Sequence, residues 1–369
     1  MNPILPLPDA VPFSAPIWLI RVLLFVTFLV HLIAMNLLLG GGVLAAISAS
    51  RGRGNVPHHR RMADSIFKLL PVVTPAAVTF GVAPLLFVQV LYGRFFYTSS
   101  ILMAVPWIAV IGFLCLAYYG HYFMSLSDTI RRERFVWVPW VAAFLVLLIG
   151  FIYTNNLTLM QTPEKFKWLY VGDRTGARLN LGEPTLIPRF LHFFVASLAV
   201  AGLGIMGVGQ RALRQGDPSF GPWAVRYGRT WFAGATLVQI LVGLWFLLTL
   251  PETIRGAFLG GDPVRSMHLF GGIFLALVAV ALALAKPESL GAFRASVALL
   301  ALGILSMILV RHWVRDMMIG KLADLGAAPV RTHWDQLIVF LVLLVVALGT
   351  VVWMVRRFFT ERAEESAQR

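Results

Sequence analysis

The sequence predicts an all-α integral membrane protein with about nine transmembrane helices, an N-terminus outside and a cytoplasmic C-terminus. Of its 369 residues, 59% are hydrophobic and only 13% are charged, whereas soluble domains carry about 25% charged residues. The mean hydropathy is +0.80, and a soluble fold of this length could not bury so much apolar surface beneath a polar skin. The apolar stretches are long and continuous, unlike the short alternating segments of a membrane β-barrel.

The nine predicted spans follow from the length that a bilayer requires. A hydrocarbon core of about 30 Å needs roughly 20 apolar residues per helix, and nine stretches satisfy this condition. They make up a single transmembrane helical domain over residues 1–369, with no separate soluble domain. The predicted spans are 16–48, 69–92, 101–125, 136–156, 186–210, 230–250, 267–285, 295–314 and 335–358.

Charge in the connectors predicts the orientation. The connectors after the first, third, fifth and ninth spans are basic, and the positive-inside rule places such segments in the cytoplasm. The net charge of +14, from 31 Lys and Arg against 17 Asp and Glu, is therefore interpreted as topology in a prokaryotic inner membrane rather than as nucleic-acid binding. The outer connector 157–185 is also somewhat basic, which weakens the asymmetry without reversing it.

Several kinds of chemistry are excluded or disfavoured. The single Cys115 excludes an internal disulfide, a thiolate-ligated zinc or iron–sulfur site from this chain alone, and heme attached through paired cysteines. No H-E-x-x-H zinc motif is present. No carboxylate lies in the middle of a span, which argues against a proton-driven pump or antiporter.

Glycines cluster in the first and fifth spans and allow two interpretations. Small residues let helix backbones approach closely, and they also leave room for a flat cofactor. Glycine alone does not separate the two, although packing is the favoured one. The residues are Gly40, Gly41, Gly42, Gly202, Gly204, Gly207 and Gly209.

Four histidines lie within or at the ends of predicted spans, where an ionisable side chain is costly and becomes a candidate for function. His31 is inside the first span, and His192, His268 and His312 lie at the outer ends of the fifth, seventh and eighth. A lone histidine in such a place is usually a hydrogen-bonded core residue. Four of them on different helices, three at one depth, favour a shared ligand.

Arginines stand close to these outer histidines. Heme b carries two propionates that need cationic partners near the membrane surface, so imidazole or thioether inside and guanidinium at the edge predict noncovalent heme. The alternative is snorkelling of arginine at helix ends, which explains the arginines but not the histidines beside them. The arginines are Arg189, Arg265, Arg311 and Arg315, and Met267 is the methionine beside His268.

Several segments together resemble subunit I of the cytochrome bd quinol oxidases, or a divergent branch of that superfamily. The family has nine transmembrane helices with the N-terminus outside and the C-terminus inside, as the hydropathy and charge of this chain predict. The matching segments are LVHLIAMNLLLGGGVLAAI (29–47), TFGVAPLLFVQVLYGRFF (79–96), RFLHFFVASLAVAGLGI (189–205) and VRSMHLFGG (264–272).

The resemblance implies particular heme ligands. His31 corresponds to the family's ligand of the high-spin heme, and His192 to a ligand of the low-spin heme b. Met267 corresponds to the other low-spin ligand, with Arg265 beside it and His268 adjacent as a possible replacement.

Departures from the family narrow what the resemblance implies. The connector PETIRGAFLGGDPVRS is far shorter than the family's quinol-binding loop. The glutamates that serve the family's oxygen-reducing hemes have no counterpart, and His312 stands in the eighth span where a glutamate ligand is absent. The resemblance therefore does not by itself imply oxygen reduction, whereas it still implies heme binding and electron transfer.

The expected function is that of a membrane cytochrome b with one to three hemes in its outer half. His192 with Met267 or His268 would hold a low-spin heme, His31 with His312 as candidate partner would hold a second, and the four arginines would balance propionates. Electrons would pass from quinol to a periplasmic multiheme cytochrome c or a second membrane subunit.

Two alternatives remain open. A heme-free quinone-binding anchor subunit would use the histidines as hydrogen-bond donors to quinone. Gln239, Asn155 and Asn156 could contact a quinone or bond neighbouring helices. A permease would need a substrate site at broken helices, and the absence of an inverted repeat argues against it.

Overall fold

The computed structural model describes residues 12–54, 56–172, 174–320, 322–323, 325–326 and 328–367. Two compact units are present, one formed by residues 1–22 with 324–369 and the other by residues 23–323. The helices are α1 Ile17–Arg51, α2 Pro57–Leu102, α3 Ala104–Leu126, α4 Thr129–Arg134, α5 Val138–Met160, η1 Pro163–Lys165, α6 Phe166–Gly172, α7 Leu186–Arg214, α8 Phe220–Thr249, α9 Glu252–Gly256, η2 Ala257–Gly261, α10 Pro263–Ala285, α11 Leu290–Ile319 and α12 Trp334–Ala367.

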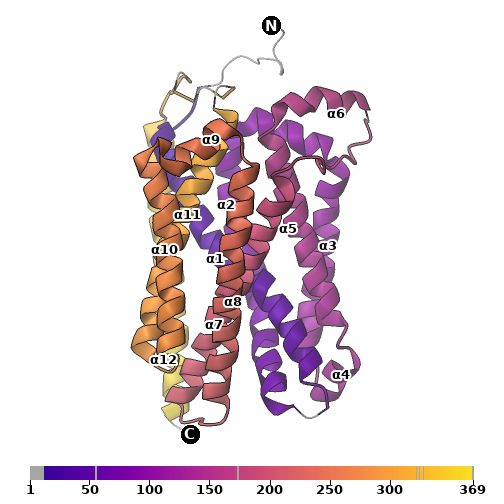
Figure 1. The fold of residues 1–369 in the computed structure, drawn as a ribbon, viewed down its shortest axis with the longest axis vertical. Helices are drawn as coiled ribbons and strands as arrows, with labels where there is room; N and C mark the ends of the chain where they lie inside the picture. Colours follow the sequence, from indigo (N-terminus) through magenta and orange to yellow (C-terminus); the bar gives the residue numbers. More distant parts are fainter. Residues whose placement is uncertain are drawn as a thin grey trace. The chain divides into compact units, whose positions relative to one another are not determined.

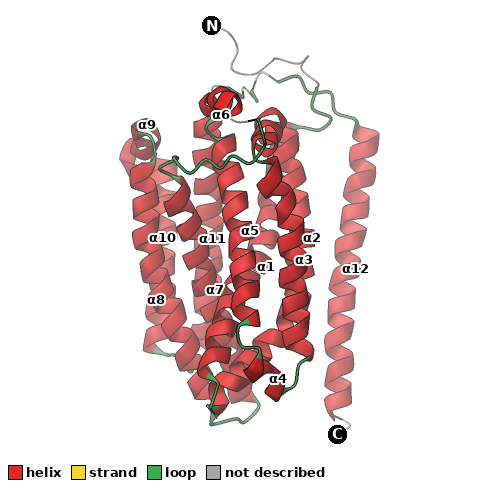
Figure 2. Ribbon diagram, turned by 90° about the vertical axis from the view of Figure 1, so that its right-hand side faces the viewer, coloured by secondary structure: helices red, strands yellow, loops and turns green. Residues whose placement is uncertain are grey.

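The described part of the chain confirms the predicted all-helical membrane fold (Figure 2). Eight of its helices are long and apolar enough to cross a membrane, namely α1, α2, α3, α5, α7, α8, α10 and α11. The ninth predicted span, 335–358, falls within α12, where the described apolar stretch is the shorter Trp334–Ala347. The first unit also contains an isolated bridge between Phe13 and Val330.

Helix α2 is much longer than the span predicted at 69–92. It starts at Pro57, where a proline suits the first helical turn because no intrahelical partner exists for its missing N–H. Three further prolines lie inside it, yet the non-helical backbone conformation falls at Tyr92 (φ −129°, ψ 27°). The interruption thus lies beside the end of α11, where the Tyr92 hydroxyl donates a 2.6 Å hydrogen bond to Asp316.

Glycine lets three helices of the second unit pack at close range. A Cβ on Gly202 of α7 would lie 2.5 Å from the backbone nitrogen of Phe232 in α8, and a Cβ on Gly40 of α1 would lie 2.0 Å from the Ser197 carbonyl oxygen in α7. These separations are too short for any side chain, so packing is the reason for glycine at these two positions.

Buried amides fasten the connector between α5 and α7. Asn155 and Asn156, both 0% exposed, lie in the second half of α5, before its last turn. Asn155 Oδ1 accepts a hydrogen bond from the backbone N–H of Asn180 (2.9 Å), and Asn156 Oδ1 accepts one from the Ser99 hydroxyl (3.2 Å). Asn155 and Asn156 therefore bond neighbouring segments of the chain, which is the alternative to contact with a quinone.

The two ends of the second unit differ in their short elements. Helices α6 and α9 lie at one end and α4 at the other (Figure 1). Near α4, three arginines each meet a carboxylate from another segment. The pairs are Arg60 with Glu133, Arg61 with Asp217, and Arg132 with Asp64.

Candidate cofactor site

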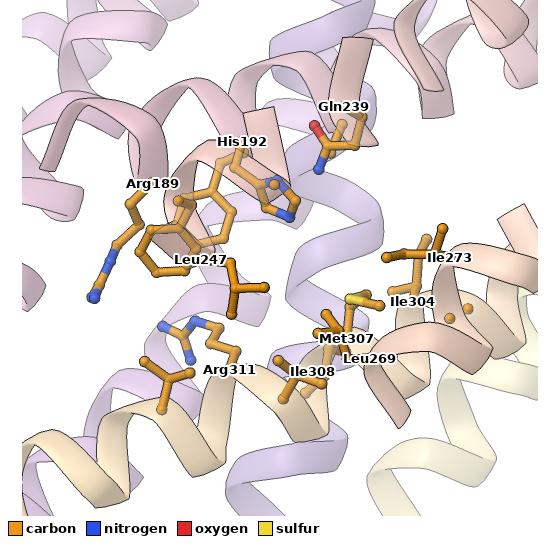
Figure 3. A pocket seen from close by; sticks show the side chains of 18 of the residues that line it. Arg189, His192, Gln239, Leu247, Leu269, Ile273, Ile304, Met307, Ile308 and Arg311 are labelled. Atoms are coloured by element: carbon orange, nitrogen blue, oxygen red, sulfur yellow. The ribbon is translucent and has the colours of Figure 1, made fainter. Parts of the chain in front are cut away.

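A cavity of about 240 Å³ lies in the second unit, lined by residues of α1, α5, α7, α8, α10 and α11. On this scale one water needs only about 10–15 Å³. Most of the lining is aliphatic or aromatic, with a small number of polar groups (Figure 3). A large apolar cavity with a few convergent polar groups is the usual form of a small-molecule site.

Arg189 enters this cavity from the first turn of α7 and is only 8% exposed. Its Nη1 donates a 2.9 Å hydrogen bond to the side-chain oxygen of Gln161, and its guanidinium lies 5.0 Å from the centre of the Phe246 ring. Its Nε and Nη2 are buried without a hydrogen bond to any described residue. These two atoms form the edge by which a guanidinium binds a carboxylate in bidentate fashion.

Arg311 and Arg315 reach the same cavity from the last turns of α11. The Arg311 guanidinium lies 4.2 Å from the centre of the Phe28 ring, and no described carboxylate pairs with it. Arg315 is 3% exposed and donates hydrogen bonds of 3.0 and 3.2 Å to Asp316. Figure 3 shows the guanidinium groups of Arg189 and Arg311 at the same end of the cavity.

The cationic end of the cavity has little negative charge to balance it. No aspartate or glutamate is among the described residues that line the cavity. Asp316 bonds Arg315, and Glu183 interacts electrostatically with Arg189 from outside the cavity. Desolvated charges require partners, so this end suits an anionic group attached to an apolar body.

His192 lines the cavity one turn after Arg189. Its ring lies against Gly243 of α8, where an added Cβ would come within 2.9 Å of His192 Cε1. Its Nδ1 is buried and makes no hydrogen bond to a described residue. A glycine at this point of α8 therefore leaves the space that the imidazole occupies.

His31 and His312 both lie near Phe28, and neither is among the residues that line the cavity. The Phe28 ring centre is 6.3 Å from each imidazole centre. His31 Nδ1 is 3.0 Å from the Ala77 carbonyl oxygen, and His312 Nδ1 is 2.7 Å from that of Ile308. When Nδ1 donates to a carbonyl, Nε2 carries the lone pair, which is the tautomer that ligates iron.

Besides His31 and His312, three more of the residues predicted from sequence do not line the cavity. Met267 is 63% exposed, and His268 Nδ1 is 2.8 Å from the Val264 carbonyl oxygen while its ring packs edge-on against Trp313. Arg265 forms an ion pair of 2.9 Å with Asp262 at the start of α10. The residues of α10 that line the cavity are Leu269, Gly272, Ile273 and Ala276.

The cavity also contains residues that the sequence analysis did not single out. Met307 of α11 lines it, with its methyl group against Gly272, where an added Cβ would come within 2.3 Å of Met307 Cε. Asn36 of α1 lines it as well and is 3% exposed. Helical spacing could have found the methionine, because Met307, Arg311 and Arg315 recur every four residues along α11.

The described residues hold no group of three or more His, Cys, Asp or Glu side chains placed to bind a metal ion. A metal held by this cavity would therefore have to bring most of its own ligands, as the iron of a porphyrin does.

No family model matches the sequence, and no curated protein matches it. Among solved structures, the chain is similar to the bd oxidase from Geobacillus thermodenitrificans, with 15% sequence identity and a TM-score of 0.74. The alignment covers 94% of this chain and 100% of that chain. The resemblance stated from sequence is therefore confirmed as a likeness of fold over nearly the whole chain.

Proposed function

We propose that this chain is a heme b-binding electron-transfer subunit of a prokaryotic inner membrane, with a heme in the cavity described above. The observation that carries the proposal is the buried, unbonded Nε–Nη2 edge of Arg189 at the cationic end of an apolar cavity. A heme b has an apolar macrocycle and two carboxylates, and the cavity offers a matching distribution of apolar lining and guanidinium groups.

His192 and Met307 would be the side chains that hold the iron of this heme. His192 approaches from α7 and Met307 from α11, and Figure 3 shows both side chains in the lining. Met307 takes the place foreseen for Met267, which is 63% exposed. Arg189, Arg311 and Arg315 would hold the propionates, and a heme held in this way would supply one-electron redox chemistry.

His31 and His312 would serve a second heme. Their Nδ1 atoms lie within hydrogen-bond distance of backbone carbonyls, which favours the tautomer that binds iron through Nε2. His268, whose Nδ1 is bonded in the same way to Val264, is a ligand only if α10 rotates, so it ranks behind them.

Electrons would enter from a quinol and leave to a periplasmic multiheme cytochrome c or to a second membrane subunit. The likeness of fold to a bd oxidase supports a redox role in the membrane. The cationic end of the cavity is formed at the start of α7 and near the end of α11. These helix ends lie at the end of the unit that carries α6 and α9, which the distribution of basic connectors predicts to be outside. An outer heme shortens the electron-transfer distance to a periplasmic acceptor.

The test is the absorbance of the purified chain and of a His192→Ala variant. The wild type, expressed with ample heme supply, should show Soret and α bands and a b-type pyridine hemochrome. His192→Ala should lose one spectral component, whereas His333→Ala, at an exposed histidine outside the cavity, should keep the wild-type spectrum. A colourless wild type contradicts the proposal.

A second candidate is a heme-free anchor subunit that binds quinone in the same cavity. Asn36 Oδ1, Gln239 Oε1 and His192 Nδ1 are buried in its lining without hydrogen bonds to described residues. Buried polar atoms of this kind need partners, and the two hydroxyls of a quinol could supply them. In that case the chain is colourless, and Gln239→Leu weakens the binding of a quinone analogue.

A further inference from the structure

The two sides of the Arg189 guanidinium have different environments. Nη1 is occupied by Gln161 at 2.9 Å, whereas Nε and Nη2 have no hydrogen bond to a described residue. A guanidinium is planar, so a hydrogen bond on one side determines where the other side points. The group that holds Nη1 therefore decides whether the carboxylate-binding edge faces the cavity.

Gln161 is itself fixed in orientation. It follows the last residue of α5, is 6% exposed, and donates from Nε2 to the Leu157 carbonyl oxygen at 2.9 Å. This bond determines which end of the amide is the oxygen, since only the nitrogen can donate. Gln161 thus presents its side-chain oxygen as an acceptor to Arg189. No other described residue of the connector between α5 and α7 bonds that guanidinium.

Glu183 supplies a negative charge that interacts electrostatically with Arg189 without a described hydrogen bond or ion pair between them. It is 9% exposed, accepts a 3.1 Å hydrogen bond from the Thr185 hydroxyl and forms a 2.6 Å ion pair with Lys165. Its carboxylate also interacts electrostatically with Arg189. Lys165 and Arg189 therefore share one buried carboxylate. Glu183 neutralises the positive charge of Arg189 only in part, so a positive potential remains in the cavity.

We propose that Gln161 and Glu183 are positioning residues for the ligand of the cavity. Gln161 aims the Nε–Nη2 edge of Arg189 into the cavity, and Glu183 limits how much positive charge reaches the ligand there. The inference rests on the proposed function, because the ligand whose carboxylate meets this edge is taken to be heme. It assigns to the connector between α5 and α7 a role in tuning the cofactor.

The two roles predict different effects: a change at Gln161 should alter the rate of heme release, and a change at Glu183 should alter the midpoint potential. Gln161→Leu frees the guanidinium to turn, so heme should be released about tenfold faster, as for loss of a hydrogen bond to a charged group. Glu183→Gln removes a negative charge near the site, so the oxidised, more positive heme is disfavoured. The midpoint potential of heme in Glu183→Gln should rise, and this variant should release heme no faster than wild type does.

The experiment measures heme transfer to excess apomyoglobin and the midpoint potential from a redox titration of the purified, heme-loaded chain. Glu164→Gln is the matched control, since Glu164 is an exposed glutamate of the same connector, and it should change neither quantity. Gln161→Glu keeps an acceptor for Nη1, so its release rate should stay close to wild type while its midpoint potential falls. If Gln161→Leu fails to fold, Gln161→Glu still tests the proposal, because it keeps the orientation of the Arg189 guanidinium and changes only the charge beside it.

The outcomes distinguish failure of the positioning roles of Gln161 and Glu183 from failure of heme binding itself. Equal release rates for wild type and Gln161→Leu, or unchanged potentials in Glu183→Gln and Gln161→Glu, overturn the inference and leave heme binding standing. A wild type that takes up no heme overturns the proposed function and this inference together.

Discussion

Arginines at the two ends of the second unit have opposite surroundings. Near α4, three arginines each pair with a carboxylate that comes from a distant part of the sequence. At the cavity, Arg311 has no described carboxylate partner, Arg189 bonds only the neutral Gln161, and Arg315 shares Asp316 with Tyr92.

This difference in pairing distinguishes arginines that stabilise the fold from arginines that are placed to bind a ligand. An ion pair between segments is complete in the folded chain and needs nothing further. A buried cation without a counter-charge costs several kcal/mol, and the repulsion among Arg189, Arg311 and Arg315 adds to that cost. Such an arrangement is understandable where an anionic group completes it.

The largest expected effect is on Arg311, which has the fewest partners. Arg311→Gln should weaken cofactor binding by about tenfold to a hundredfold, the range for lost hydrogen bonds to a charged group. The same change should raise the unfolding temperature of the cofactor-free protein, because it removes a repelled, desolvated charge. Titration with hemin and thermal unfolding in detergent measure the two effects.

The opposite end supplies the contrast for this prediction. Asp64→Asn, which breaks the 2.5 Å pair with Arg132, should lower the unfolding temperature with and without cofactor and leave the affinity unchanged. Arg226→Gln, at an exposed arginine of α8, should change neither. If Arg311→Gln destabilises the cofactor-free protein as Asp64→Asn does, the distinction between the two ends is lost.

Sequence reasoning located the helices and part of the site, and helix rotation explains the rest. One residue along an α-helix turns the side chain by about 100°. The motif at the start of α10 predicts Met267 with the adjacent His268, but the residues of α10 that line the cavity begin at Leu269, one residue after His268. Charge predicts Arg311 and Arg315, which do line the cavity, as does Met307 one turn earlier.

Other features depend on long-range contacts that no local pattern contains. The hydrogen bond between Gln161 and Arg189 joins the residue after α5 to the first turn of α7 across a long connector. The close fit of His192 against Gly243 depends on how α7 packs along α8. Both follow from tertiary packing, so the local pattern of a single sequence does not show them.

A smaller effect is expected at Gly243, which tests whether the imidazole position matters at the cavity end. Gly243→Ala places a Cβ 2.9 Å from His192 Cε1 and 3.2 Å from Nδ1, so the ring must shift. The Soret maximum should move and hemin affinity should fall severalfold, within the usual range of overpacking effects. Gly234→Ala, on the same helix with open space at its Cβ, should leave the spectrum unchanged. An unshifted Soret band in Gly243→Ala contradicts the assignment of His192 as a ligand.

The smallest effect belongs to the paired end and depends on pH. Asp217 lies in the turn between α7 and α8, where the backbone N–H of Phe220 and the Arg61 side chain hold its pKa below the ordinary value of 3.8. Because the folded state binds the proton less readily than the unfolded state, this stabilisation is complete above the ordinary pKa and is lost as the pH falls through the lowered one.

Asp217→Asn removes this pH dependence. Its unfolding temperature should lie below wild type at about pH 6, and the gap should narrow as the pH falls to about 3. Thermal unfolding in detergent across this range measures the gap, with Glu164→Gln as the variant that follows wild type throughout. A gap that is the same at both pH values would show that the Asp217 carboxylate contributes nothing through its charge. In that case the paired end would be held by packing, and the contrast with the cavity end would rest on the cavity arginines alone.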